Sequence, residues 1–199
     1  MKLNMKLLEI LGYMCLVMAI VATAQDPVLD TAGQPLESGV EYYVKPAITD
    51  NGGRFTVIDR NNSCRYYAGQ ENALGPEGFP LRFEPFAEEE SMVIGESRDV
   101  KVTVVVYTTC ITSTTWKLAE IDPVTQRRLI GTGDDGSASN YFRINKQDEG
   151  IYNFQWCPTE VCPLCKFDCT TTTVGALVEN GKRLLALDGP VLPVVFERA

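Results

Sequence analysis

The chain contains no histidine among its 199 residues. Without an imidazole it cannot build a Ser-His-Asp or Cys-His catalytic arrangement, nor a metal site with histidine ligands. No other nucleophile stands beside a base in a recognisable pattern. We therefore expect a protein that is not an enzyme and that uses neither a cofactor nor a metal ion.

The chain also has fewer basic residues than acidic ones. The chain carries 18 lysine and arginine residues against 26 aspartate and glutamate residues, which gives a formal net charge of -8. Such a chain repels a phosphate backbone, so we expect no nucleic-acid partner. The hydrophobic fraction of 45% is ordinary for a globular protein and excludes a fully disordered chain or a collagen.

Long apolar runs are absent after the first residues. The uncharged stretch from Ile10 to Ala24 follows Lys2 and Lys6, and it ends in the small-x-small signal Ala22-Thr23-Ala24. This order predicts a secretory signal peptide over residues 1–24, with a signal anchor as the alternative. We expect residues 25–199 to form one secreted domain, monomeric and outside the membrane, in the extracellular space or a vacuole.

The cysteine count fits a secreted protein. One of the seven cysteines, Cys15, lies in the predicted signal, which leaves an even number. Six cysteines form three disulfides in any of 15 pairings, and the clustering near the C-terminus favours local bridges there and one large loop. The alternative is a zinc site or redox dithiol in the dense cluster. The six are Cys64, Cys110, Cys157, Cys162, Cys165 and Cys169.

Short stretches rich in β-branched and aromatic residues recur along the chain, and no stretch shows a sustained helical period. This pattern predicts an all-β domain, a sandwich or a barrel. We expect strands at 41–45, 54–59, 100–107, 115–121, 141–145, 151–156, 183–187 and 191–196. Trp116 and Trp156 are expected in the core rather than on a sugar-binding surface.

Several motifs resemble the plant Kunitz inhibitors of the soybean trypsin inhibitor type, and within them the miraculin-like branch. The match begins at Val28–Leu36 and Tyr42–Val44, and it includes the cysteine cluster that starts at Cys157. The resemblance implies a β-trefoil of twelve strands with pseudo-threefold symmetry, stapled by disulfides. It also implies three pairings, which are Cys64–Cys110, Cys157–Cys169 and Cys162–Cys165.

The resemblance further implies that the chain inhibits a serine protease as a pseudo-substrate. Such inhibitors present a convex loop already held in its bound form, so little entropy is lost on docking. By the family pattern Ala87 would enter the primary specificity pocket, and Ser38 would occupy the position that braces the loop. The implied reactive-site residues are Pro85, Phe86, Ala87, Glu88 and Glu89.

The residue types in this loop bear on the target. Ala87 cannot neutralise an aspartate at the base of a trypsin pocket, so we expect an elastase-like target, or a chymotrypsin-like one if Phe86 occupies the pocket. One alternative is a non-inhibitory binding, storage or defence protein that takes a sugar, a pigment or a receptor. Another is an inhibitor of cysteine or aspartic proteases. Asn61-Asn62-Ser63 is a glycosylation sequon, which predicts a glycan on Asn61.

Overall fold

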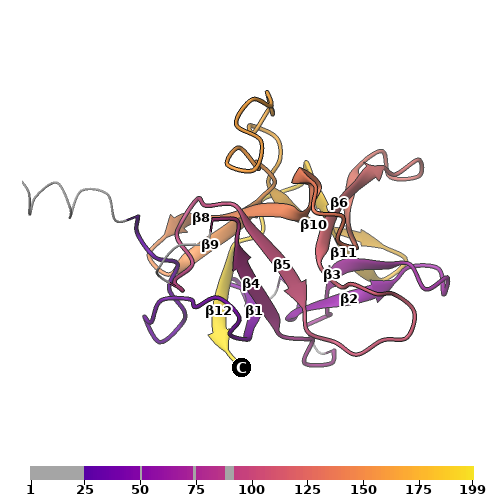
Figure 1. Cartoon of the computed structure of the whole chain (residues 1–199). Coiled ribbons are helices and arrows are strands. Elements are labelled where there is room, and N and C mark those ends of the chain that lie inside the picture. Colours follow the sequence, from indigo (N-terminus) through magenta and orange to yellow (C-terminus); the bar gives the residue numbers. More distant parts are fainter. Residues whose placement is uncertain (1–24, 50, 74, 88–91) are drawn as a thin grey trace, which may run out of the picture.

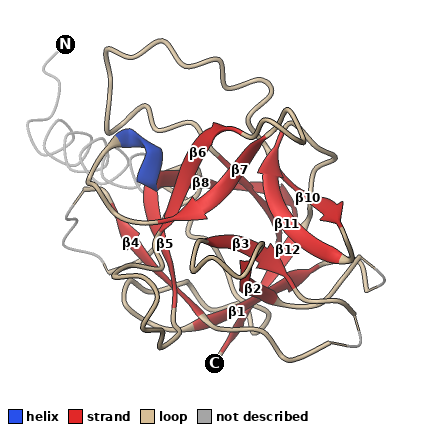
Figure 2. Cartoon of the chain, turned by 90° about the vertical axis from the view of Figure 1, so that its right-hand side faces the viewer, coloured by secondary structure: helices blue, strands red, loops and turns tan. Residues whose placement is uncertain are grey.

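We describe the fold from a computed structural model, which describes residues 25–49, 51–73, 75–87 and 92–199. The predicted signal peptide, residues 1–24, lies outside this range, and its boundary stays a prediction. The described residues form twelve short strands and one 3-10 helix, η1 (Ala138–Asn140), drawn in blue in Figure 2. The strands are β1 (Tyr42–Pro46), β2 (Phe55–Asp59), β3 (Tyr66–Gln70), β4 (Leu81–Pro85), β5 (Val100–Val104), β6 (Trp116–Ile121), β7 (Arg128–Thr132), β8 (Tyr141–Asp148), β9 (Ile151–Gln155), β10 (Val174–Glu179), β11 (Lys182–Leu187) and β12 (Val194–Arg198).

The strands repeat one four-strand unit three times. Six strands close a barrel in the order β1-β12-β9-β8-β5-β4, and the others form a second sheet of three hairpins at one end of it (Figure 1). Each group of four consecutive strands gives its first and fourth members to the barrel and its second and third to the hairpin sheet. This arrangement is a β-trefoil, which confirms the expected fold class and the twelve strands.

The core fills the barrel and the space beneath the hairpins with aromatic side chains. Strand residues alternate between the two faces, so that in β1 Tyr42 and Val44 point inward and are fully buried. Trp116 packs edge-on against Phe142 and Phe154, with ring centroids 5.5 and 5.0 Å away. Burial of each such ring is worth about 1.5–3 kcal/mol relative to exposure. Trp116 and Trp156 are both buried, as the sequence predicts.

Three charged side chains join the turns of the three hairpins. Arg60 follows β2, Asp122 follows β6, and Glu179 ends β10, so they occupy corresponding places in the three repeats. The Arg60 guanidinium donates to both carboxylates, with Nε and Nη2 each 2.6 Å from a Glu179 oxygen. The Arg60 and Asp122 side chains are each only 10% exposed. This triad therefore fixes the hairpins to one another.

Some strand boundaries differ from those expected. The strand expected over 100–107 ends at Val104, and the last strand begins at Val194 rather than at Val191. The sequence patterns gave no sign of β3, β4, β7 and β10. Among the helices that the structure describes, none is long and apolar enough to cross a membrane.

Candidate functional site

The expected reactive segment follows β4 and leads to β5, and we call residues 86–99 the β4–β5 loop. Pro85 is the last residue of β4, and Phe86 and Ala87 are the first two of the loop. The Phe86 amide donates to the Asp99 carbonyl oxygen at 2.8 Å, and the Phe86 ring lies edge-on against Tyr141. These contacts hold the start of the loop while leaving Phe86 43% exposed. Glu88 and Glu89, expected in the same site, lie outside the described residues.

The other flank of the loop is held by the N-terminal segment. Val28 donates to the Ile94 carbonyl oxygen at 2.9 Å, and the Ile94 amide donates to Leu36 at 2.8 Å. The Ser38 amide donates to the Met92 carbonyl oxygen at 2.6 Å. Ser38 therefore lies beside the loop, and its role as the bracing residue stays a prediction. No described residue accepts a hydrogen bond from its hydroxyl group, so its backbone makes the contact.

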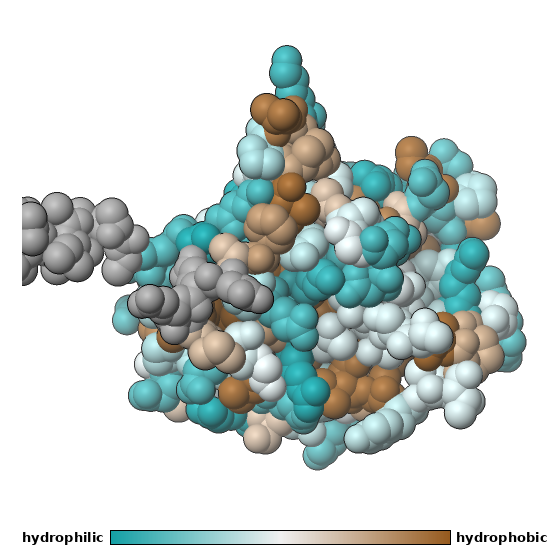
Figure 3. Space-filling model, in the orientation of Figure 1, coloured by the Kyte–Doolittle hydropathy of each residue, from teal (hydrophilic) through white to brown (hydrophobic). Residues whose placement is uncertain are grey.

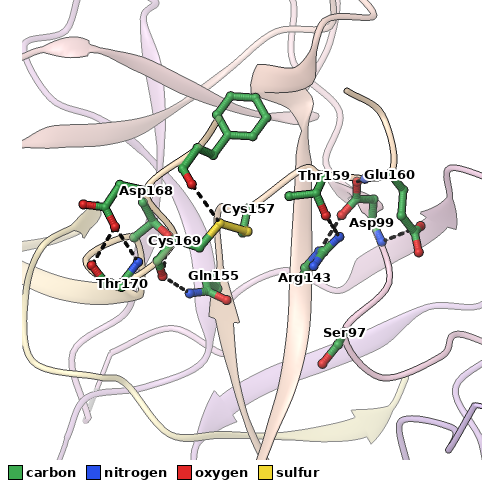
Figure 4. Close-up of a disulfide and its surroundings, with 12 residues drawn as sticks. Ser97, Asp99, Arg143, Gln155, Cys157, Thr159, Glu160, Asp168, Cys169 and Thr170 are labelled. Atoms are coloured by element: carbon green, nitrogen blue, oxygen red, sulfur yellow. Dashed lines mark hydrogen bonds and ion pairs between the residues drawn. A yellow bond between two sulfur atoms is a disulfide. The ribbon is translucent and has the colours of Figure 1, made fainter. Parts of the chain in front are cut away.

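A fully buried carboxylate connects the end of the β4–β5 loop to a second loop (Figure 4). Asp99 immediately precedes β5, and its Oδ1 accepts from Arg143 Nε at 2.6 Å. Its Oδ2 accepts from the amides of Glu160 and Val161 at 2.7 and 3.0 Å. The Arg143 guanidinium also donates to Thr159 Oγ1 at 2.6 Å. Sequence reasoning missed Asp99, because an acid before an apolar strand carries no sign that it is buried.

The second loop lies between the paired cysteines Cys157 and Cys169, and we call it the cysteine loop (residues 157–169). It connects β9 to β10 and rises from the body of the molecule (Figures 1 and 3). Its base adjoins the base of the β4–β5 loop, where one small depression is bounded by both. The depression is lined by Pro85, Phe86, Ala87, Val93, Gly95, Arg98, Asp99 and Glu160.

All six cysteines of the predicted mature chain are in disulfides. The structure pairs Cys64 with Cys110, Cys157 with Cys169 and Cys162 with Cys165, as the resemblance implies. The clustered cysteines are thus not thiolates available to zinc. In the part of the chain that the structure describes, no group of three or more metal-binding side chains is placed to hold an ion. The Cys64–Cys110 bridge encloses the whole β4–β5 loop.

One carboxyl group in the C-terminal flank of the β4–β5 loop has an altered acidity. Burial raises the pKa of Glu96, and Lys146, whose Nζ lies 3.8 Å from Glu96 Oε1, opposes the rise. Lys146 belongs to β8, so this ion pair also joins the flank to the barrel.

A second hollow lies on the hairpin sheet, away from the two loops. It has a volume of about 320 Å³ and lies between β3 and the β6–β7 hairpin. Tyr66 and Tyr67 line it together with two cationic and two acidic residues, which are Arg65, Lys117, Glu120 and Asp122. Near it, the sequon residue Asn61 is exposed in the turn after β2.

Comparisons with known proteins agree on one family. The model of the family described as "Trypsin and protease inhibitor" (Kunitz, legume type) matches residues 28–198. A curated relative, Kunitz type trypsin inhibitor 106 of Medicago truncatula, is 46% identical over 100% of this chain and 98% of its own length. The solved structure of the rice (Oryza sativa) bifunctional alpha-amylase/subtilisin inhibitor is 31% identical with a TM-score of 0.72, over 88% of this chain and 100% of that one. The potato Kunitz-type cysteine protease inhibitor PCPI-3 gives 28% identity and a TM-score of 0.74, over 88% and 98%.

Proposed function

The chain belongs to the Kunitz-type family of trypsin and protease inhibitors, and on that premise we propose that it inhibits a serine endopeptidase as a pseudo-substrate. The β4–β5 loop is the segment that enters the protease cleft, with Ala87 in the primary specificity pocket and the Ala87–Glu88 bond at the catalytic serine. The protein itself catalyses no reaction. The observation that carries the proposal is the support of this loop from both flanks.

That support provides the physical basis for inhibition. Phe86, the first residue of the loop, donates its amide to Asp99 at the end of the loop, and Val93 and Gly95 are paired with the N-terminal segment. A loop restrained in this way loses little conformational entropy when a protease binds it. If the bond is cut, the new ends stay close, because the Cys64–Cys110 disulfide and the flanking hydrogen bonds hold both sides. The amide can then reform before the products leave.

The side chain at position 87 sets the expected target. A methyl group fills a small, apolar specificity pocket such as that of an elastase, and it leaves the aspartate of a trypsin pocket without a partner. Phe86 would suit a chymotrypsin-like pocket if the register were shifted by one residue. We therefore propose an elastase- or chymotrypsin-like target and weak inhibition of trypsin.

A protease panel tests this proposal. The oxidised chain 25–199 is assayed against elastase, chymotrypsin, trypsin, a papain-like protease and an aspartic protease. We expect one-to-one inhibition of an elastase- or chymotrypsin-like enzyme. The variant Ala87→Arg should improve inhibition of trypsin at least tenfold, whereas Ala73→Arg, which places the same side chain on an exposed connection before β4, should not.

Two outcomes would count against it. A folded Ala87→Arg variant with no change in specificity would contradict the register. A wild-type protein that inhibits none of the serine proteases would contradict the proposed target class, and inhibition of the papain-like enzyme alone would favour the activity named for the potato relative.

The hollow between β3 and the β6–β7 hairpin supports a second candidate function, that of a small-molecule binding protein without inhibitory activity. Its volume of about 320 Å³ lies at the lower end of the range for ligand pockets. Tyrosine side chains beside charged groups of both signs suit a sugar, which stacks on aromatic faces and exchanges hydrogen bonds with polar side chains. A glycan array would identify such a ligand.

We also propose that the protein is secreted, carries a glycan on Asn61 and is a monomer. The features of residues 1–24 and the three disulfides support secretion, and the exposure of Asn61 supports the glycan. Mass spectrometry of the protein purified from its tissue would show the new N-terminus and the glycan. An N-terminus at Met1 and an unmodified Asn61 would contradict it.

A further inference from the structure

The tip of the cysteine loop presents one large apolar side chain to solvent. Leu164 is 95% exposed, and it lies with Pro163 between the disulfide-bonded Cys162 and Cys165. Figure 3 shows apolar side chains near the top of this projection. An isolated exposed leucine is common on protein surfaces. Leu164 is informative only because disulfides restrain its backbone and because the β4–β5 loop lies beside the base of its loop.

The backbone around Leu164 is restrained both at the tip and at the base of the cysteine loop. The Cys165 amide donates to the Cys162 carbonyl oxygen at 3.1 Å, which closes a β-turn inside the disulfide ring. The Cys157–Cys169 disulfide closes the base of the loop. Gln155 Nε2 donates to the Cys169 carbonyl oxygen at 2.5 Å, as Figure 4 shows. The backbone at Leu164 therefore loses little freedom when a partner covers the tip.

The base of the cysteine loop is fixed to the base of the β4–β5 loop. Glu160 and Val161 donate their amides to Asp99, whose carbonyl oxygen accepts the amide of Phe86. Glu160 also borders the depression that Phe86 and Ala87 line. The two bases are therefore adjacent, so a protease bound at the start of the β4–β5 loop lies beside the base of the cysteine loop.

The tip itself is not shaped as a substrate. A β-turn at Pro163 and Leu164 reverses the chain, whereas a protease cleft takes an extended backbone. The apolar side chain of Leu164 remains available for a surface contact outside the cleft.

We propose that the cysteine loop is a second contact surface for the same protease that the β4–β5 loop enters, with Leu164 seated in an apolar depression beside the protease cleft. This inference rests on the proposed function, since the partner is the inhibited protease. It makes Leu164 a residue that determines affinity and selectivity among proteases that share a specificity pocket.

The test compares inhibition constants of three variants against the serine protease that the wild-type protein inhibits best. Burial of a leucine side chain corresponds to a factor of about ten to a hundred in affinity. We expect Leu164→Ala to weaken inhibition about tenfold and Leu164→Asp at least as much, mainly through faster dissociation. The control Val124→Asp alters another highly exposed apolar residue, on the β6–β7 turn at the right of Figure 1, and should change inhibition less than twofold.

The outcomes separate this inference from the function on which it rests. If the wild-type protein inhibits the protease and both Leu164 variants have the same inhibition constant as the wild type, the second contact surface is overturned and the proposed function stands. Tighter inhibition by Leu164→Asp would overturn it as well, because the loop would then hinder docking. A wild-type protein without serine protease inhibition would overturn both. Because Leu164 is exposed, both variants are expected to fold. If Leu164→Asp does not fold, the inhibition constant of Leu164→Ala alone decides the result.

Discussion

Replacing Asp99 with alanine should destabilise the protein and loosen both loops. The Asp99 carboxylate is fully buried, and it accepts hydrogen bonds from Arg143 and from the amides of Glu160 and Val161. Its removal leaves the Arg143 guanidinium, which is 17% exposed, without its ionic partner. Breaking a buried pair in this way costs about 3–5 kcal/mol. At about 2–4 °C per kcal/mol for a domain of this size, the midpoint of thermal unfolding should fall by roughly 6–20 °C.

The assay is urea unfolding followed by tryptophan fluorescence, since Trp116 and Trp156 are buried in the folded state. The midpoint should fall with little change in the slope against urea, because the surface exposed on unfolding is similar. Asp99→Asn keeps one oxygen that can accept from the two amides, but it loses the charge and turns a donating NH2 group toward Arg143 Nε, so it should also destabilise the protein. A loss below about 1 kcal/mol for Asp99→Ala would refute the view that this carboxylate fixes the two loops.

Two further predictions concern the scaffold. The Arg60 guanidinium lowers the pKa values of Asp122 and Glu179; the stability that the triad contributes should therefore be complete above about pH 5 and fall as the pH drops below about 4. Arg60→Met should flatten this acid dependence in urea titrations from pH 7 to pH 2, and an unchanged slope would contradict the assignment. Removing the Cys64–Cys110 disulfide by paired serine substitutions opens a loop with a sequence separation of 46 and should cost about 4 kcal/mol, measured by urea unfolding. A cost under 1 kcal/mol would show that the bridge does not restrain the unfolded chain.

The class of fold was predictable because strands leave a local pattern. Alternating apolar residues in segments such as Tyr42–Pro46 and Val100–Val104 favour β structure from neighbouring positions alone. The trefoil and the disulfide pairing came from the resemblance, since short strands and cysteine spacings do not define how distant segments pair.

Strands that the sequence did not indicate owe their place to distant neighbours. β3 contains Gly69, where a Cβ atom would lie 2.3 Å from Ile58 Cδ1 and 2.8 Å from the Arg183 carbonyl oxygen. Glycine weakens the local strand signal, yet it is needed there because another backbone passes close by. The opposite error occurs at Tyr107. Its residue type favours a strand, but it lies beyond the end of β5 and is fully exposed.

The sequence offered a candidate site, whose role stays a prediction, but it did not indicate how that site is supported. The family pattern placed Pro85, Phe86 and Ala87 at the start of the β4–β5 loop and Ser38 beside it. The role of Asp99 depends on Arg143 and on Glu160, which are 44 and 61 residues away in the sequence. No local pattern reports such a contact, because burial of a charge is decided by the packing of the whole domain.

The most direct test of the central claim is to locate the bond that the target protease cuts. The oxidised chain 25–199 is incubated with a catalytic amount of the inhibited enzyme, and the products are identified by mass spectrometry before and after reduction. We expect a single slow cut at Ala87–Glu88, two fragments that stay joined until Cys64–Cys110 is reduced, and full inhibition by the cut form. Rapid cleavage at several places, with the enzyme left active, would contradict the account.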